Sequence, residues 1–149
     1  MHPLRLDLGL CPQSFDPHAL LQPWEQQHSR AATAVFIGRM RGQGSNGEAL
    51  QAMELEHYPG MSEQQLEQLA QTISAREQAA AVLLRHRVGR VLPGEALVLV
   101  AVAAERRGMA QRCCQQLLEA IKHEAPFWKK EIPSCGEGRW VEANSPYLN

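Results

Sequence analysis

The stretch Pro126-Phe127-Trp128-Lys129-Lys130-Glu131 decides how the C-terminal half of this chain folds. Pro126 lacks an N–H and restricts the residue before it, so the preceding helix must stop here and a strand follows. Apolar side chains beside a lysine exclude water, and a desolvated lysine loses its proton more readily or binds anions more strongly. The stretch therefore predicts either a site built on a lysine, or a strand whose aromatic side chains pack inward while its lysines face solvent.

The segments around this stretch predict a helix before it and a hairpin after it. The helix covers roughly Met109 to Glu124, and its apolar side carries Met109, Cys113, Leu117, Ala120 and Ile121. Downstream, Arg139-Trp140-Val141-Glu142 pairs with the lysine strand over a turn at Ser134 to Gly138. Because these elements are short and adjacent, we expect the last strands to form an antiparallel hairpin.

Further strands and helices follow from the hydrophobic periodicity of the rest of the chain. Leu4 to Leu10 alternates as a half-buried strand, and Asp16-Pro17 supplies the cap and first-turn proline of a short helix ending near Gln27. The other predicted strands are Ala31–Met40, Leu50–His57, Val82–Val88 and Leu97–Ala103, the last two joined around Pro93-Gly94. Two main helices against mainly antiparallel strands, with a hairpin subdomain, predict an α+β fold.

Two local features carry more specific expectations. The segment Gly42-Gln43-Gly44-Ser45-Asn46-Gly47 has too much backbone freedom for regular structure, so it predicts a hairpin between Ala31–Met40 and Leu50–His57 with a mobile tip. Ser62-Glu63-Gln64-Gln65 fits a capping box that opens a helix with Leu66, Leu69 and Ile73 on one face.

Composition limits the classes of function. With 149 residues, 44% of them hydrophobic, residues 1–149 form one globular domain, and a net charge of −1 does not indicate a nucleic-acid or acidic-membrane surface. The longest apolar run, Ala96 to Ala104, is far shorter than the ~20 residues that span a bilayer. The N-terminus has no signal-peptide core, and the four cysteines have no C-x-x-C spacing, so we expect a reduced cytoplasmic protein without a metal site.

Basic residues recur at two further places. Arg106-Arg107 stands where a helix begins, although positive charge there opposes the helix dipole, and such a violation suits binding of a phosphate or carboxylate. The alternative is that one arginine pairs with Glu105 or Glu119. Arg39 and Arg41 alternate around Met40, which predicts either an anion grip or a solvated strand face. A turn at Pro126 could bring Lys122 and Lys129 together.

These residues are also where the chain resembles a known family, the large catalytic subunit of molybdopterin synthase. The motifs that carry the resemblance occur in order from Phe36 to Glu142: Phe36-x-Gly38-x-x-Arg41, Leu55-Glu56-His57-Tyr58-Pro59-Gly60-Met61, His86-Arg87-Val88-Gly89, Pro93-Gly94-Glu95, Lys122-x-x-Ala125-Pro126-Phe127-Trp128-Lys129-Lys130-Glu131 and Arg139-Trp140-Val141-Glu142. The lysine segment is the most specific of them.

The resemblance implies an α/β-hammerhead fold and a sulfurtransferase. Such enzymes convert cyclic pyranopterin monophosphate into molybdopterin by installing two dithiolene sulfurs, a step of molybdenum cofactor biosynthesis. The sulfur arrives as a thiocarboxylate on the C-terminal glycine of a small ubiquitin-like subunit. Two large subunits form a central homodimer with one small subunit at each end of the heterotetramer, and the subunit itself uses no cofactor or metal.

Roles for individual residues follow from the same resemblance. Lys129 and Lys122 are expected to be catalytic, with Lys129 beside the thiocarboxylate as a proton-transfer or oxyanion-stabilising group. Attack by its amine on the acyl group is a less favoured route. Substrate binding is expected of Arg41, Arg106, Arg107 and Phe36, because guanidinium groups suit phosphate.

One departure bears on activity: the family usually has His-Arg where this chain has Arg106-Arg107, and arginine does not exchange protons near neutral pH. The alternative function is a non-catalytic paralogue that binds a phosphorylated pterin or docks the small-subunit tail. Other candidates are given no part in the reaction. Cys135 is interpreted as an incidental thiol, and His86 with Arg87 as a packing or interface pair.

Overall fold

The computed structural model describes residues 3–141, which form two four-stranded sheets and three helices. The first sheet has the order β1 (Arg5–Cys11), β4 (Ala81–Arg87), β6 (Ala96–Ala104), β2 (Ala32–Arg39). β1 lies parallel to β4, and the other neighbours are antiparallel. The strands of this sheet are those that the periodicity predicts, shifted by one or two residues, whereas the short strand at 89–91 in the second sheet was not predicted. The α+β prediction is confirmed.

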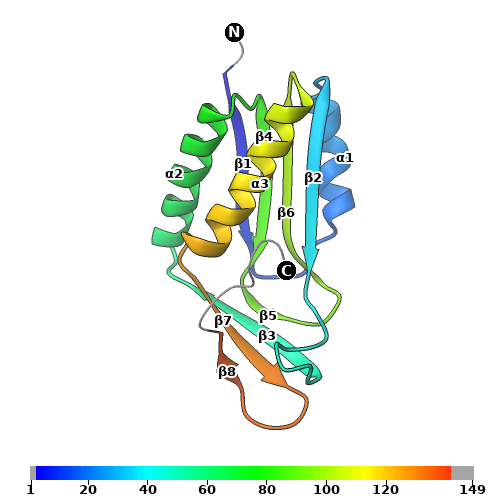
Figure 1. The fold of residues 1–149 in the computed structure, drawn as a ribbon, viewed down its shortest axis with the longest axis vertical. Helices are drawn as coiled ribbons and strands as arrows, with labels where there is room; N and C mark the ends of the chain where they lie inside the picture. The colour runs from blue at the N-terminus through cyan, green and yellow to red at the C-terminus, as the bar shows by residue number, and fades with distance from the viewer. Residues whose placement is uncertain (1–2, 142–149) are drawn as a thin grey trace.

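Helices cover both faces of the first sheet (Figure 1). α2 (Met61–Arg76) and α3 (Arg107–His123) pack on one face, where their apolar side chains meet alternate residues of β4 and β6, including Val82, Leu84, Val100 and Val102. α1 (Pro17–Gln27) covers the other face, where Trp24 packs on Leu83, Leu99 and Ala101. Because β4 and β6 are buried on both faces, they read as continuous apolar runs rather than alternating ones.

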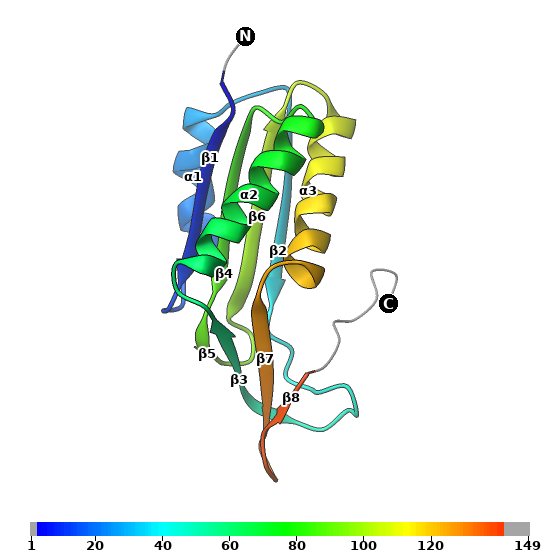
Figure 2. The same cartoon turned by 90° about the vertical axis from the view of Figure 1, so that its left-hand side faces the viewer.

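The second sheet lies beyond one end of the first sheet, and Figure 2 shows β7 leaving the end of α3 to join it. Its order is β5 (Gly89–Val91), β3 (Leu50–His57), β7 (Phe127–Pro133), β8 (Arg139–Trp140). The predicted last hairpin is confirmed by the pairing of Glu131 with Arg139, while Glu142 lies outside the described residues. Residues 3–141 contain no helix long and apolar enough to cross a membrane.

The predicted hairpin between the strands flanking Gly42 to Gly47 is wrong. β2 pairs with β6 in the first sheet, whereas β3 pairs with β5 and β7 in the second. The glycine-rich segment is instead a connection between sheets, closed by an isolated bridge between Gln43 and Ala49. Alternation in each strand was read correctly, but it does not encode which distant strand becomes the neighbour.

The start of α2 also differs from the prediction. The helix begins at Met61, and the N-cap is Gly60, whose φ of 83° favours glycine. Glu63 accepts a hydrogen bond from the Gly60 N–H at 2.8 Å, so one half of a capping box exists. Ser62 is not the cap: its hydroxyl accepts from Tyr58 N at 2.9 Å and donates to Pro126 O at 3.2 Å. Ser62 therefore ties this helix start to the turn that launches β7.

A buried guanidinium joins the two sheets. Arg87, at the end of β4, is only 3% exposed and donates to Cys11 O at 3.2 Å, Arg90 O at 2.6 Å and the Glu95 carboxylate at 3.2 Å. The same carboxylate oxygen accepts from Leu92 N at 2.8 Å. The hydrogen bonds from Leu92 and Arg87 hold the pKa of Glu95 below its usual value.

Removing this carboxylate should destabilise the protein. Glu95→Ala leaves the Arg87 charge buried without its counter-ion, and we expect the free energy of unfolding to fall by about 3 kcal/mol. The matched control is Glu54→Ala, because the Glu54–Arg90 pair is 3.8 Å long and exposed on both sides; that variant should lose less than about 1 kcal/mol. Urea unfolding measures both, and equal losses would contradict the assignment.

Candidate functional site

The two faces of β7 have opposite environments. Phe127 and Lys129 face the first sheet, where Phe127 stacks on His86 with ring centroids 4.4 Å apart. Trp128 faces outward, is 44% exposed and touches Tyr58 edge-on at 5.0 Å. The interpretation with both aromatic residues inward and the lysines in solvent is therefore wrong, because neighbours in a strand point to opposite faces.

Lys129 is a perturbed basic group of the site. Burial lowers the pKa of its amine, and the positive charges of Lys122 and Arg41 lower it further, while Glu131 acts in the opposite direction. The end of α3, the segment after β2 and β7 itself thus place their charges around one amine. Such a lysine can exchange a proton or stabilise a nearby anion at lower energetic cost than a solvated lysine can.

The fold explains how these groups meet. Lys122 is in the last turn of α3, and the chain turns at Pro126 into β7, which carries Lys129. Arg41 follows the end of β2 and is exposed, with Met40 buried before it. Phe36 lies upstream on β2 and is 38% exposed. A Cβ on Gly38 would lie 3.0 Å from the Phe36 ring and 2.9 Å from Val98, so glycine leaves the ring its space.

Arg106 and Arg107 do not join this cluster within one chain. Arg106 is the N-cap of α3 and Arg107 its first residue, whereas Lys122 is the last residue but one. At about 1.5 Å per residue, Arg107 and Lys122 are about 22 Å apart along the helix axis; Figure 1 shows the two ends of α3 at different heights of the sheet.

The expected acidic partners of these arginines are engaged elsewhere. Glu105 pairs with Arg30 at 3.1 Å, and Glu119 pairs with His123 at 3.2 Å. Neither arginine side chain makes an ion pair with another residue of the 3–141 range. Both remain exposed and available to an anion or to a second chain.

The sequence predicts that His86 and Arg87 are a packing or interface pair, and His86 does pack on Phe127. It is 6% exposed at the end of β4, and its Nδ1 lies 2.7 Å from Arg87 O. Burial lowers the pKa of His86 to about 4, and the charge of Lys129 contributes in the same direction. A histidine at the end of an apolar strand, beside an arginine, was the available signal, but the partner Phe127 is far away in sequence.

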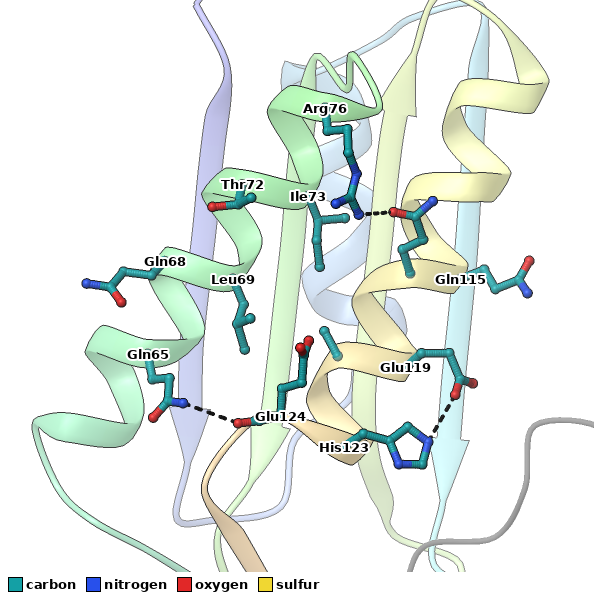
Figure 3. Close-up of a pocket in the computed structure, with 12 residues that line it drawn as sticks. Gln65, Gln68, Leu69, Thr72, Ile73, Arg76, Gln115, Glu119, His123 and Glu124 are labelled. Atoms are coloured by element: carbon teal, nitrogen blue, oxygen red, sulfur yellow. Dashed lines mark hydrogen bonds and ion pairs between the residues drawn. The ribbon is translucent and has the colours of Figure 1, made fainter.

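A groove of about 780 Å³ lies between α2 and α3, apart from the lysine cluster (Figure 3). It is lined by apolar side chains such as Leu69 and Ile73 together with the polar residues Gln65, Gln68, Thr72, Arg76, Gln115 and Glu119. None of the six residues expected to act in catalysis or substrate binding lines it. In the part of the chain that is described, no group of three or more His, Cys, Asp or Glu side chains could hold a metal ion.

The fold is α+β, and the positive charges of Lys122 and Arg41 lie around the partly buried Lys129. Comparison with known proteins then identifies the family: the MoaE protein family model matches residues 10–124. The molybdopterin synthase catalytic subunit of Haemophilus influenzae is 36% identical over 138 residues, which cover 93% of this chain and 91% of that protein. The chain belongs to the MoaE family.

Solved structures of related proteins have the same fold as this chain. The molybdopterin biosynthesis MoaE protein from Burkholderia ambifaria superposes with a TM-score of 0.77 at 38% identity, covering 94% of this chain and 91% of that one. Molybdopterin synthase from Staphylococcus aureus gives a TM-score of 0.76 at 26% identity, covering 89% of this chain and 94% of that one. The fold implied by the resemblance is confirmed.

His86 should make the folded protein sensitive to acid. Its pKa is about 4 in the folded protein and 6.5 as the ordinary value, so between these values the unfolded chain binds a proton that the folded protein does not. The contribution is fully present above about pH 6.5 and is lost as the pH falls toward 4, by about 3 kcal/mol in total.

Urea unfolding of wild type and His86→Phe between pH 7 and 4 tests this. The phenylalanine variant lacks the titrating group and should lose less stability over that range. Parallel profiles for the two proteins would contradict the assignment.

Proposed function

We propose that this chain is the catalytic subunit of a molybdopterin synthase. It would transfer sulfur from the C-terminal thiocarboxylate of a small ubiquitin-like subunit to cyclic pyranopterin monophosphate, forming the dithiolene of molybdopterin. The observation that carries the proposal is the partly buried Lys129 amine among the charges of Lys122 and Arg41. Family membership supports the reaction class, and a cytoplasmic location is part of the same proposal.

Lys129 has the central role in this proposal. Once the thiocarboxylate sulfur is bonded to the pterin, water adds to the acyl carbon and the acyl C–S bond breaks, so the sulfur stays on the pterin and the glycine leaves as a carboxylate. Negative charge develops on the acyl oxygen as the water adds. An ammonium group at this position stabilises that charge, and an amine with a lowered pKa can also pass protons during the reaction. Lys122, on the adjoining turn of α3, would bind the substrate or move a second proton.

Arg41 and Phe36 complete the substrate side of the site. The guanidinium of Arg41 offers paired donors to the cyclic phosphate, and its charge already acts on Lys129. Phe36 offers an exposed ring, 38% accessible, on the strand that leads to Arg41. A flat pterin can stack on such a ring while its phosphate is bound by arginine.

Arg106 and Arg107 need a second copy of the chain to act on the same substrate. Their distance of about 22 Å from Lys122 along α3 is too long for one pterin to bridge. In the homodimer implied for this family, one protomer would supply Arg107 and its partner would supply Lys129. Arg106 would replace the usual histidine as an anion donor without exchanging protons.

Replacing Lys129 tests whether dithiolene formation depends on this residue while binding of the small subunit does not. We expect Lys129→Ala to lower dithiolene formation at least about 100-fold, because a positioned proton-transfer group is lost. The complex with the small subunit should still assemble, as measured by size-exclusion chromatography. The matched control is Lys130→Ala, since Lys130 faces the other side of β7, with its amine 5.7 Å from the Trp140 ring centroid. Normal turnover by Lys129→Ala would overturn the catalytic assignment of Lys129, whereas a wild-type chain that binds the small subunit but forms no dithiolene would be a non-catalytic docking protein.

Mixed dimers test the shared site. Homodimers of Lys129→Ala and of Arg107→Ala should both be inactive at low substrate concentration. A mixed dimer contains one chain of each variant. If Arg107 of one protomer and Lys129 of the other form one site, this dimer has one site in which both residues are intact, and it regains activity. If both residues served one chain, the mixed dimer would have no intact site, and its inactivity would overturn the shared arrangement.

A further inference from the structure

His86 and Phe127 form a contact between the two sheets next to Lys129. Their rings are parallel within 5°, with centroids 4.4 Å apart. His86 belongs to β4 of the first sheet, and Phe127 is the first residue of β7 in the second. Lys129 follows two residues later and therefore projects from the same face of β7 as Phe127. The stack thus lies at the point where β7, carrying Lys129, begins.

Hydrogen bonding fixes the orientation of the His86 ring. Nδ1 lies 2.7 Å from Arg87 O, and a carbonyl oxygen only accepts, so Nδ1 carries the proton. Burial keeps the ring neutral at ordinary pH, with a pKa of about 4. The anchor is itself rigid, because the Arg87 guanidinium is bound by Cys11 O, Arg90 O and Glu95. A flat, uncharged surface therefore stands at a fixed place beside the site.

Because positive charges already surround Lys129, it matters that the neighbouring imidazole of His86 is neutral. Lys122 on α3 and Arg41 after β2 already repel its ammonium form, and Glu131 on β7 offsets part of this. A charged histidine from β4 would add a third cation to that set. The stacked neutral imidazole instead excludes water from the inner side of β7 without adding charge.

We propose that His86 is a positioning residue: its imidazole, stacked on Phe127, fixes the start of β7 and thereby the place of the Lys129 amine in a water-poor site. This inference rests on the proposed catalytic role of Lys129. In this role His86 does more than fill space: the plane of its ring and the position of the stack both determine where β7 begins. A displacement of about 1 Å at a reacting group can cost about 100-fold in rate.

Two substitutions at His86 distinguish the effect of the ring from the effect of its hydrogen bond. In His86→Asn the side-chain amide can still donate to Arg87 O, but the ring is lost. In His86→Phe the ring remains and the donor is lost. We expect His86→Asn to lower kcat by up to about 100-fold with little change in KM. We expect His86→Phe to recover most of that loss. His57→Asn is the matched control, since His57 pairs with Phe127 across the ladder but does not stack on it.

A second readout does not depend on activity. Competitive labelling of amines gives the pKa of Lys129 in each variant. In His86→Asn water enters, so this pKa should rise toward the ordinary lysine value, whereas His86→Phe should match wild type. Phe127→Leu removes the other half of the stack and should reproduce the effects of His86→Asn on kcat and on Lys129. This variant also covers the case in which His86→Asn does not fold.

The outcomes are distinct. Wild-type kcat and an unchanged Lys129 pKa in His86→Asn or in Phe127→Leu would overturn the positioning role. A loss in His86→Phe with a wild-type rate in His86→Asn would assign the effect to the hydrogen bond, and equal losses in the two variants would show that the ring stack does not carry it; either result would also overturn the positioning role. If the wild-type chain formed no dithiolene, the proposed function would fail, while the labelling experiment would still decide whether the stack controls the pKa of Lys129.

Discussion

The buried Arg87 guanidinium is the constraint on which the arrangement of the two sheets depends. β4 ends at Arg87, and β5 starts at Gly89, whose φ of 82° lets the chain turn between the sheets. The guanidinium binds the end of β1, the backbone of β5 and the turn before β6 at once. Since His86 belongs to one sheet and Lys129 to the other, the geometry of the site follows from this joint.

Local patterns in the sequence were sufficient for the elements but not for their pairing. Alternation located β3 at Leu50–His57 correctly, and Asp16 was recognised as the cap of α1, where it accepts from His18 N at 3.0 Å. The neighbour of β3 is β7, in which Lys129 lies opposite Leu55. That contact spans more than seventy positions of the chain, and hydrophobic periodicity carries no information about it. The nearer strand β2 was the reasonable but wrong partner.

The candidate site, like the fold, could be predicted where it depends on local sequence but not where it depends on contacts between distant segments. Lys122 and Lys129 could be assigned together because only a turn at Pro126 separates their elements. Arg41 was identified as a candidate, but its approach to Lys129 depends on the sheet joint and required the structure. Arg107 was grouped with them although α3 holds it at the other end of a 17-residue helix. His86 was interpreted as packing because a stack between sheets leaves no spacing pattern in the sequence.

The first turn of α2 carries a consequence for how variation in this protein would be distributed. Ser62 holds Pro126 O at 3.2 Å, and Gln65 donates to Glu124 O at 3.3 Å, so both bind the backbone that connects Lys122 to Lys129. A loss-of-function screen would therefore return changes at these two uncharged positions of a different helix. The placement of the two lysines therefore depends on a helix that carries neither of them.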